Sequence, residues 1–317
     1  MPYLFNPPGK FIAFGRVNFR LVYTLLPTIG TLIADAPSSD RYQFISLGCG
    51  SAFEVQALAI IAKSRQINID YTGFDIDRTE LSFNKRYLKH RAPAISQDYE
   101  QRDLADNPPL TQLNNAHCIL WRHPEFLSDH PEIPTNLILK MTQIFTHTLA
   151  HKSATSPLLI TTYDPHEMLL VINLLRALTG ENCLFEMTVD KRAERASMEN
   201  PVIAAKDKDP LFNLNHHDQF QLRILDATLV INPENKSELT AIITSALSKT
   251  LGQCGIDETV EAHSPLVNPS TINLDTIRTA ISCLNDSIRS HSKPLEARAH
   301  LIGCLETATT VTLSSTV

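Results

Sequence analysis

Apolar positions follow two different spacings between residues 42 and 232. Short apolar runs rich in aromatic and β-branched side chains, such as residues 43–47, are typical of buried parallel strands. Between these runs, apolar residues recur at three- and four-residue intervals, as at Val55, Leu58 and Ala62, and this spacing predicts helices. The alternation predicts an α/β fold: a doubly wound, mostly parallel sheet of seven strands with helices on both faces.

The boundaries of these elements follow from the same pattern. The expected strands are residues 43–47, 67–75, 95–102, 117–121, 157–163, 183–189 and 220–231. The expected helices are residues 16–34, a helix following the first strand, and residues 79–88, 137–150 and 167–178. Ser51 followed by Glu54 predicts a capping box at the start of the second of these helices.

The pattern changes after Asn232-Pro233, and this change suggests a division of the chain. Residues 1–41 are expected to form a helical cap, residues 42–233 the α/β domain, and residues 234–317 a helical C-terminal module. Three roles stay open for the module: forming a homodimer, covering the cleft, or contacting a protein acceptor.

Composition narrows the classes of function. The 317 residues carry a net charge of −6, which disfavours a broad nucleic-acid surface because such surfaces usually have a basic excess. No apolar run is long enough to cross a membrane, and the N-terminal segment does not have the pattern of a secretory signal. The six cysteines are scattered without a CxxC pair, which predicts reduced thiols in a cytoplasmic protein.

The turn after the first strand is the first candidate site. It reads Gly48-Cys49-Gly50, and glycine allows a tight turn and close approach of a ligand to the backbone. A dinucleotide fingerprint needs a third glycine, but Phe53 stands in its place, and the chain has no phosphate-binding P-loop motif.

Acidic residues follow the next two strands. Asp75 ends the second strand and Asp103 follows the third, so both are expected at the edge of the sheet that carries the glycine turn. A carboxylate there can accept hydrogen bonds from ribose hydroxyls. Asp77 is interpreted as a helix cap.

These residues resemble the Rossmann-like (class I) methyltransferases that depend on S-adenosylmethionine (SAM). The resemblance covers roughly residues 42–232 and implies a seven-stranded sheet with one antiparallel strand. It also implies a SAM site. The resemblance implies that the methionine and ribose parts of SAM face Gly48, Cys49 and Gly50. It implies that Asp75 holds the ribose hydroxyls and that the adenine contacts Ile76, Asp103 and Leu104.

The sequence departs from the family pattern at two positions. Ser46 stands where the family has an acid, and Ala52 stands where a later glycine is frequent. These departures keep a second hypothesis open, namely a catalytically silent SAM-binding or regulatory protein of the same fold. A nucleotide-dependent oxidoreductase is a third hypothesis, and Phe53 speaks against it.

The segment after the fourth strand is the candidate catalytic site. Arg122, His123 and Glu125 form a polar trio there, and His123 could take a proton from a hydroxyl or amine acceptor. In the alternative interpretation, Arg122 and Glu125 form a structural ion pair. The [DN]-P-P-[YF] sequence of base-methylating enzymes is absent at this position, so a small-molecule or protein acceptor is expected. No metal site is predicted, and His147 and His151 are interpreted as a solvated helix face.

Overall fold

The structure is a computed structural model that describes residues 25–127, 136–162, 165–189 and 220–254. Its strands are β1 (Arg41–Leu47), β2 (Asn68–Asp75), β3 (Ser96–Gln101), β4 (Cys118–Arg122), β5 (Leu158–Thr162), β6 (Cys183–Val189) and β7 (Phe220–Ala227). Its named helices are α2 (Glu54–Arg65), α3 (Arg78–Arg91), α4 (Leu110–Asn115), α5 (Leu137–His151), α6 (Pro165–Thr179) and α9 (Lys236–Gln253). Residues 25–35 are also helical.

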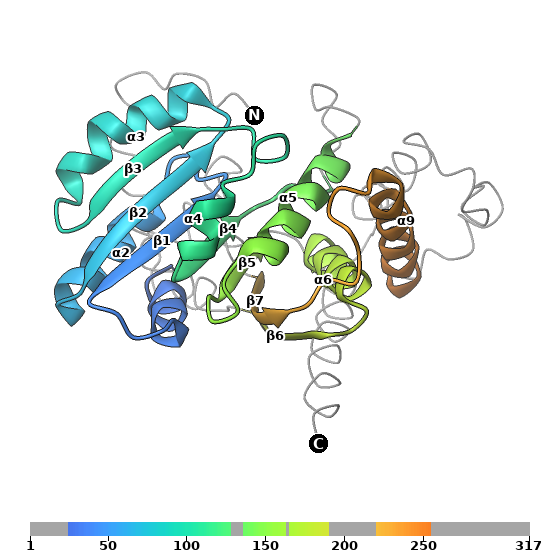
Figure 1. The fold of residues 1–317 in the computed structure, drawn as a ribbon. Coiled ribbons are helices and arrows are strands. Elements are labelled where there is room, and N and C mark those ends of the chain that lie inside the picture. The colour runs from blue at the N-terminus through green and yellow to red at the C-terminus, as the bar shows by residue number, and fades with distance from the viewer. Residues whose placement is uncertain (1–24, 128–135, 163–164, 190–219, 255–317) are drawn as a thin grey trace, which may run out of the picture.

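The seven strands form one sheet in the order β3-β2-β1-β4-β5-β7-β6 (Figure 1). All neighbouring pairs from β3 to β5 are parallel, whereas β7 runs antiparallel to both β5 and β6. The prediction of a mostly parallel seven-stranded α/β sheet with one antiparallel strand is therefore confirmed.

The two faces of the sheet carry separate apolar clusters. Successive side chains of a strand point to opposite faces, so Phe44 belongs to the cluster with α2, α3 and residues 25–36, whereas Ile45 belongs to the cluster with α4, α5, α6 and α9. Figure 1 shows α4 and α5 in front of the sheet and α2 behind it. The helices therefore lie on both faces, as a doubly wound fold requires.

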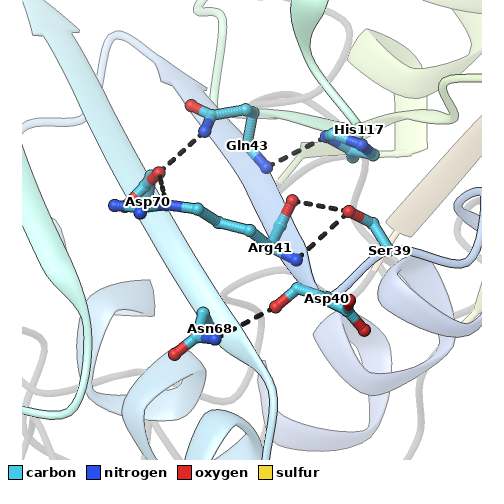
Figure 2. Close-up of polar contacts among 7 residues, drawn as sticks. All are labelled: Ser39, Asp40, Arg41, Gln43, Asn68, Asp70 and His117. Carbon is cyan, nitrogen blue, oxygen red and sulfur yellow. Dashed lines mark hydrogen bonds and ion pairs between the residues drawn. The ribbon is translucent and has the colours of Figure 1, made fainter.

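Polar contacts fix the start of β1 against its neighbours (Figure 2). Asp70 on β2 accepts hydrogen bonds from Arg41 Nε at 2.5 Å and Nη2 at 2.8 Å, and from Gln43 Nε2 at 2.7 Å. The Gln43 backbone N–H donates to Nδ1 of His117, which directly precedes β4, at 3.1 Å. These contacts set the register at the amino ends of the strands, away from the glycine turn.

Two local expectations need correction. The Ser51–Glu54 capping box is wrong: α2 begins at Glu54 after Phe53, which makes no side-chain cap, and the Ser51 hydroxyl donates instead to Glu80 on α3 at 2.9 Å. The short helix α4 was not expected, because its six residues follow Pro108-Pro109 and carry no clear helical pattern. Asp77, however, caps α3 by accepting from the N–H groups of Thr79 and Glu80, as expected.

Beyond the sheet, α9 packs against α6, where Asn173 Nδ2 donates to Thr250 Oγ1 at 2.9 Å. The proposed division at residue 233 stays a prediction, since residues 255–317 lie outside the described residues. Within the described ranges, no helix combines the length and the apolar character needed to cross a membrane.

Candidate cofactor and acceptor site

The glycine turn lies beside the carboxyl end of β2. Strands β1 and β2 are parallel with Leu47 paired to Phe74, so the residues that follow each strand emerge at the same edge of the sheet. The Cys49 N–H donates to the Phe74 carbonyl oxygen at 2.9 Å, which continues the strand pairing into the turn. The sheet thus places residues 48–53 directly next to Asp75.

The conformation of the turn explains its glycines. Gly48 and Gly50 have φ angles of +58° and +47°, in the left-handed region that glycine adopts at low cost. Gly50 is held on both sides, because its N–H donates to Asp75 Oδ2 at 2.7 Å and its carbonyl accepts from Asn84 Nδ2 at 2.6 Å. The turn is therefore preformed, and β2 and α3 fix it.

Gly73 allows the turn to approach β2 closely. A Cβ atom at position 73 would lie 2.8 Å from Cys49 Sγ and 2.9 Å from the Tyr71 hydroxyl oxygen, closer than atoms normally pack. Burial raises the pKa of Cys49 well above its usual range, and the neighbouring Glu54 and Asp75 carboxylates raise it further. Cys49 is thus a neutral thiol within the turn, and its side chain is buried against β2.

The Asp75 carboxylate can accept further hydrogen bonds at this edge of the sheet. Its Oδ2 accepts from Gly50 N–H and its Oδ1 from Asp77 N–H at 2.8 Å, so each oxygen keeps a further lone pair. In the part of the chain that the structure describes, no cationic side chain forms an ion pair with Asp75. The neighbouring Ile76 side chain is 64% exposed, which makes it an apolar surface next to the carboxylate.

Asp103 and Leu104, which the resemblance assigned to adenine, both make contacts within the protein. Asp103 accepts from Lys140 Nζ at 2.8 Å and from the Ala105 N–H at 3.1 Å. Burial alone would raise the pKa of Asp103, but these hydrogen bonds lower it below its usual value. Leu104 is buried in the apolar cluster with α4 and α5, so its side chain belongs to the core.

Glu54 is the residue that the sequence analysis missed as part of the site. It opens α2 directly after the glycine turn, and its side chain is completely buried. Its Oε1 accepts from the hydroxyl groups of Ser46 and Tyr71, each at 2.7 Å. The available signal was Ser46, which stands where the resembling family has an acid and whose hydroxyl donates to the Glu54 carboxylate.

The segment after β4 holds the three residues predicted as catalytic. Arg122 Nη1 lies 3.6 Å from Glu54 Oε2. Among the described contacts, Arg122 therefore forms an ion pair with Glu54 of α2, and not with Glu125 as in the alternative interpretation. His123 and Glu125 have φ angles of +51° and +57°, an uncommon conformation for residues other than glycine. The His123 N–H donates to the Thr161 carbonyl at 2.8 Å, which ties this segment to β5.

Of the two histidines on α5 that were considered from sequence, His147 is part of the packing. His147 on α5 is 6% exposed, so its assignment to a solvated helix face is wrong, and burial lowers its pKa. Within the described residues, no group of three or more histidine, cysteine, aspartate or glutamate side chains is arranged to hold a metal ion. Tyr163 and Asp164, at the end of the fifth expected strand, lie outside the described residues.

The order of the strands, the reversed β7 and the glycine turn give the chain the Rossmann-like methyltransferase fold that the sequence resemblance implied. No family model and no curated protein sequence matches the chain.

Several solved structures are similar at low identity. The plantazolicin methyltransferase BpumL in complex with SAH is 14% identical, and the match covers 70% of this chain and 91% of that chain with a TM-score of 0.42. A putative class I S-adenosylmethionine-dependent methyltransferase from Listeria monocytogenes is 9% identical, with 67% and 62% covered and a TM-score of 0.43. A putative sarcosine dimethylglycine methyltransferase from Galdieria sulphuraria is 13% identical, with 67% and 86% covered and a TM-score of 0.37. These similarities are too distant to define a function, and the fold rests on this chain's own strand order and directions.

Proposed function

We propose that this chain is a SAM-dependent methyltransferase that binds SAM at the carboxyl ends of β1 and β2 and transfers its methyl group to a small-molecule or protein acceptor. The charge at the glycine turn carries this proposal. The turn is flanked by two carboxylates, Glu54 beneath it and Asp75 beside it, and the Gly50 N–H is already bound to Asp75.

This charge disfavours a phosphate-bearing ligand. A glycine turn before a helix usually binds phosphate through free N–H groups and the positive end of the helix dipole. Here an anion would meet Glu54 in the first turn of α2 and would compete with Asp75 for Gly50. SAM has no phosphate, and its positive sulfonium and ammonium groups outweigh its single carboxylate, so its net positive charge matches the site.

The residues present fit the parts of SAM. Asp75 keeps acceptor capacity on both oxygens, which suits two ribose hydroxyls. Ile76 is an exposed apolar side chain next to it and suits the flat face of adenine. Gly48 and Gly50 carry no side chain that would block the methionine part.

SAM supplies an already activated methyl group, so the protein's task is to align the acceptor and to exclude water. Residues Arg122, His123 and Glu125 stand at the end of β4, the strand next to β1 in the sheet. In this proposal, Glu54 orients Arg122 through their ion pair, and His123 takes the proton of a hydroxyl or amine acceptor.

A silent SAM-binding protein is the second candidate function, and Ser46 in place of the family acid is the observation that favours it. The two candidates share the binding site and differ only in methyl transfer.

One experiment tests both candidates. The full chain is heated with and without SAM, since a ligand at a hundred times its Kd stabilises the folded state by about 2.7 kcal/mol and raises the melting temperature. The chain is then incubated with methyl-labelled SAM and fractionated small molecules or proteins. Stabilisation with label transfer supports the methyltransferase, stabilisation without transfer to either pool supports the silent protein, and no stabilisation by millimolar SAM contradicts both.

A further inference from the structure

The carboxylate of Glu54 has an incomplete set of partners. It is 0% exposed, and Oε1 accepts from Ser46 on β1 and Tyr71 on β2. Oε2 accepts no hydrogen bond from the described residues, and Arg122 Nη1 at 3.6 Å is beyond hydrogen-bond distance from it. A buried carboxylate whose second oxygen has an ion pair but no hydrogen bond is costly to keep, which points to a use for its charge beyond that pair.

The position of the charge indicates what that use is. Glu54 is hydrogen-bonded beneath the glycine turn, at β1 and β2, whereas Arg122 belongs to β4 on the other side of β1. The pair is therefore a dipole whose negative end lies under the turn and whose positive end lies toward the proposed acceptor side. Because water is excluded around Glu54, its field is weakened less than that of a surface carboxylate.

Given the proposed SAM site, we infer that Glu54 determines the charge specificity of the cofactor site, favouring the positively charged methyl donor over its neutral thioether product, S-adenosylhomocysteine (SAH). Glu54 acts through its field and through the turn that it supports, without touching the cofactor. This preference would help the site to release SAH after transfer, since the thioether no longer carries the charge that Glu54 attracts. The inference rests on the proposed function and deepens it.

The test compares two ligands that differ in charge at one position. Sinefungin carries a protonated amine where SAM has its sulfonium, and SAH carries a neutral sulfur there. Both ligands share the adenosine, ammonium and carboxylate groups. Isothermal titration of the full chain is expected to give tighter binding of sinefungin than of SAH. Glu54→Gln is expected to weaken sinefungin binding about tenfold and SAH binding less than about threefold, because a buried charge acts on a charge more than on a neutral group.

Two variants control for structural damage. Glu80→Gln removes a carboxylate that is also near the turn, bound to Ser51 Oγ at 2.9 Å but partly exposed, and its ratio of sinefungin to SAH affinity should stay within about twofold of wild type. Ser46→Asp combined with Glu54→Gln moves the acid from α2 to β1 and should restore the wild-type ratio. The double variant also tests the role of the buried acid if Glu54→Gln alone does not fold.

The outcomes separate the two claims. The role of Glu54 is overturned, and the SAM site kept, if Glu54→Gln weakens the binding of sinefungin and SAH equally. The same holds if the double variant binds both ligands but does not restore the wild-type ratio of their affinities. A wild-type chain that binds neither ligand overturns the proposed function and this inference together.

Discussion

Two aspartates on the same strand, Asp70 and Asp75, show how position decides the use of a carboxylate. Asp70 lies in the amino-terminal half of β2, where Arg41 and Gln43 bind both of its oxygens (Figure 2). Asp75 lies at the carboxyl end and accepts from backbone N–H groups in the described contacts. The first carboxylate is neutralised by a neighbouring cation, and the second keeps its charge, which the proposed function assigns to SAM binding.

The difference follows from the topology of the sheet. At the amino ends of parallel strands, side chains of adjacent strands meet one another, and their pairing fixes the register. At the carboxyl ends, the chain leaves the sheet into turns whose backbone groups point toward the space above the edge. A carboxylate held by these backbone groups is oriented without being neutralised.

The largest expected effect comes from removing the available carboxylate. Asp75→Ala should weaken SAM binding at least a hundredfold, since it removes the charged acceptor of two hydroxyl groups, each worth about 1.5–3 kcal/mol. Asp70→Ala is the matched control and should leave the affinity within about twofold. Isothermal titration of both variants measures the difference, and equal losses would show that the two carboxylates serve the same structural purpose.

A smaller loss of SAM affinity is expected when the hydrogen bond between the glycine turn and α3 is removed. Asn84→Ala removes the donor to the Gly50 carbonyl, and SAM affinity should fall about tenfold because the turn is no longer preformed. Gln97→Ala removes a comparable side-chain amide, which donates to the Ala92 carbonyl at 2.8 Å at the other end of α3. Unchanged affinity in Asn84→Ala would mean that β2 alone fixes the turn.

The exposed isoleucine gives an effect of a few-fold. Ile76→Ser should lower SAM affinity about threefold to tenfold, because burial of its apolar surface on adenine is worth about 1 kcal/mol. Its melting temperature without ligand should equal that of wild type, since the side chain is 64% exposed. Ile60→Ser, at a side chain that is 48% exposed on α2, is the control. If both variants bind SAM like wild type, adenine does not contact Ile76.

The smallest expected effect is a pH dependence at the amino ends of the strands. The hydrogen bond from Arg41 lowers the pKa of Asp70, so Asp70 contributes stability above the pKa of an unfolded aspartate, about 3.9, and loses it as the pH falls through the lower folded value. Asp70→Asn should therefore melt slightly below wild type at pH 7. The melting temperatures of the two proteins should converge as the pH falls below the folded-state pKa of Asp70, and a difference that grows as the pH falls would contradict this assignment.

The sequence predicted the sheet well because most of its strands have a clear apolar pattern, whereas the polar β3, SQDYEQ, gave only a weak signal. Central strands that are buried on both faces, such as β4 and β5, read as apolar runs. β6 lies at the edge of the sheet and was nevertheless expected at the bounds that the structure shows, Cys183–Val189. The reversed strand β7 was implied only by the family resemblance, because the pattern of a strand does not encode its direction.

The site was harder to predict, since its polar contacts join residues far apart in the chain. Ser51 and Glu54 have the spacing of a capping box, but the left-handed conformations of Gly50 and Ala52 direct the turn so that Ser51 binds Glu80. Glu54 in the first turn of a helix is ordinary in a sequence, and only the folded chain shows that it is buried against Ser46 and Tyr71. Local spacing could not show this long-range arrangement.

The most direct test of the central claim is to titrate the wild-type chain with SAM and, in parallel, with NAD⁺. Both ligands contain adenosine, but SAM presents positive groups to the glycine turn and NAD⁺ presents a pyrophosphate. A turn flanked by Glu54 and Asp75 predicts micromolar binding of SAM and no measurable binding of NAD⁺ at the same concentrations. Binding of NAD⁺ as tight as that of SAM, or no binding of SAM at millimolar concentration, would contradict the account.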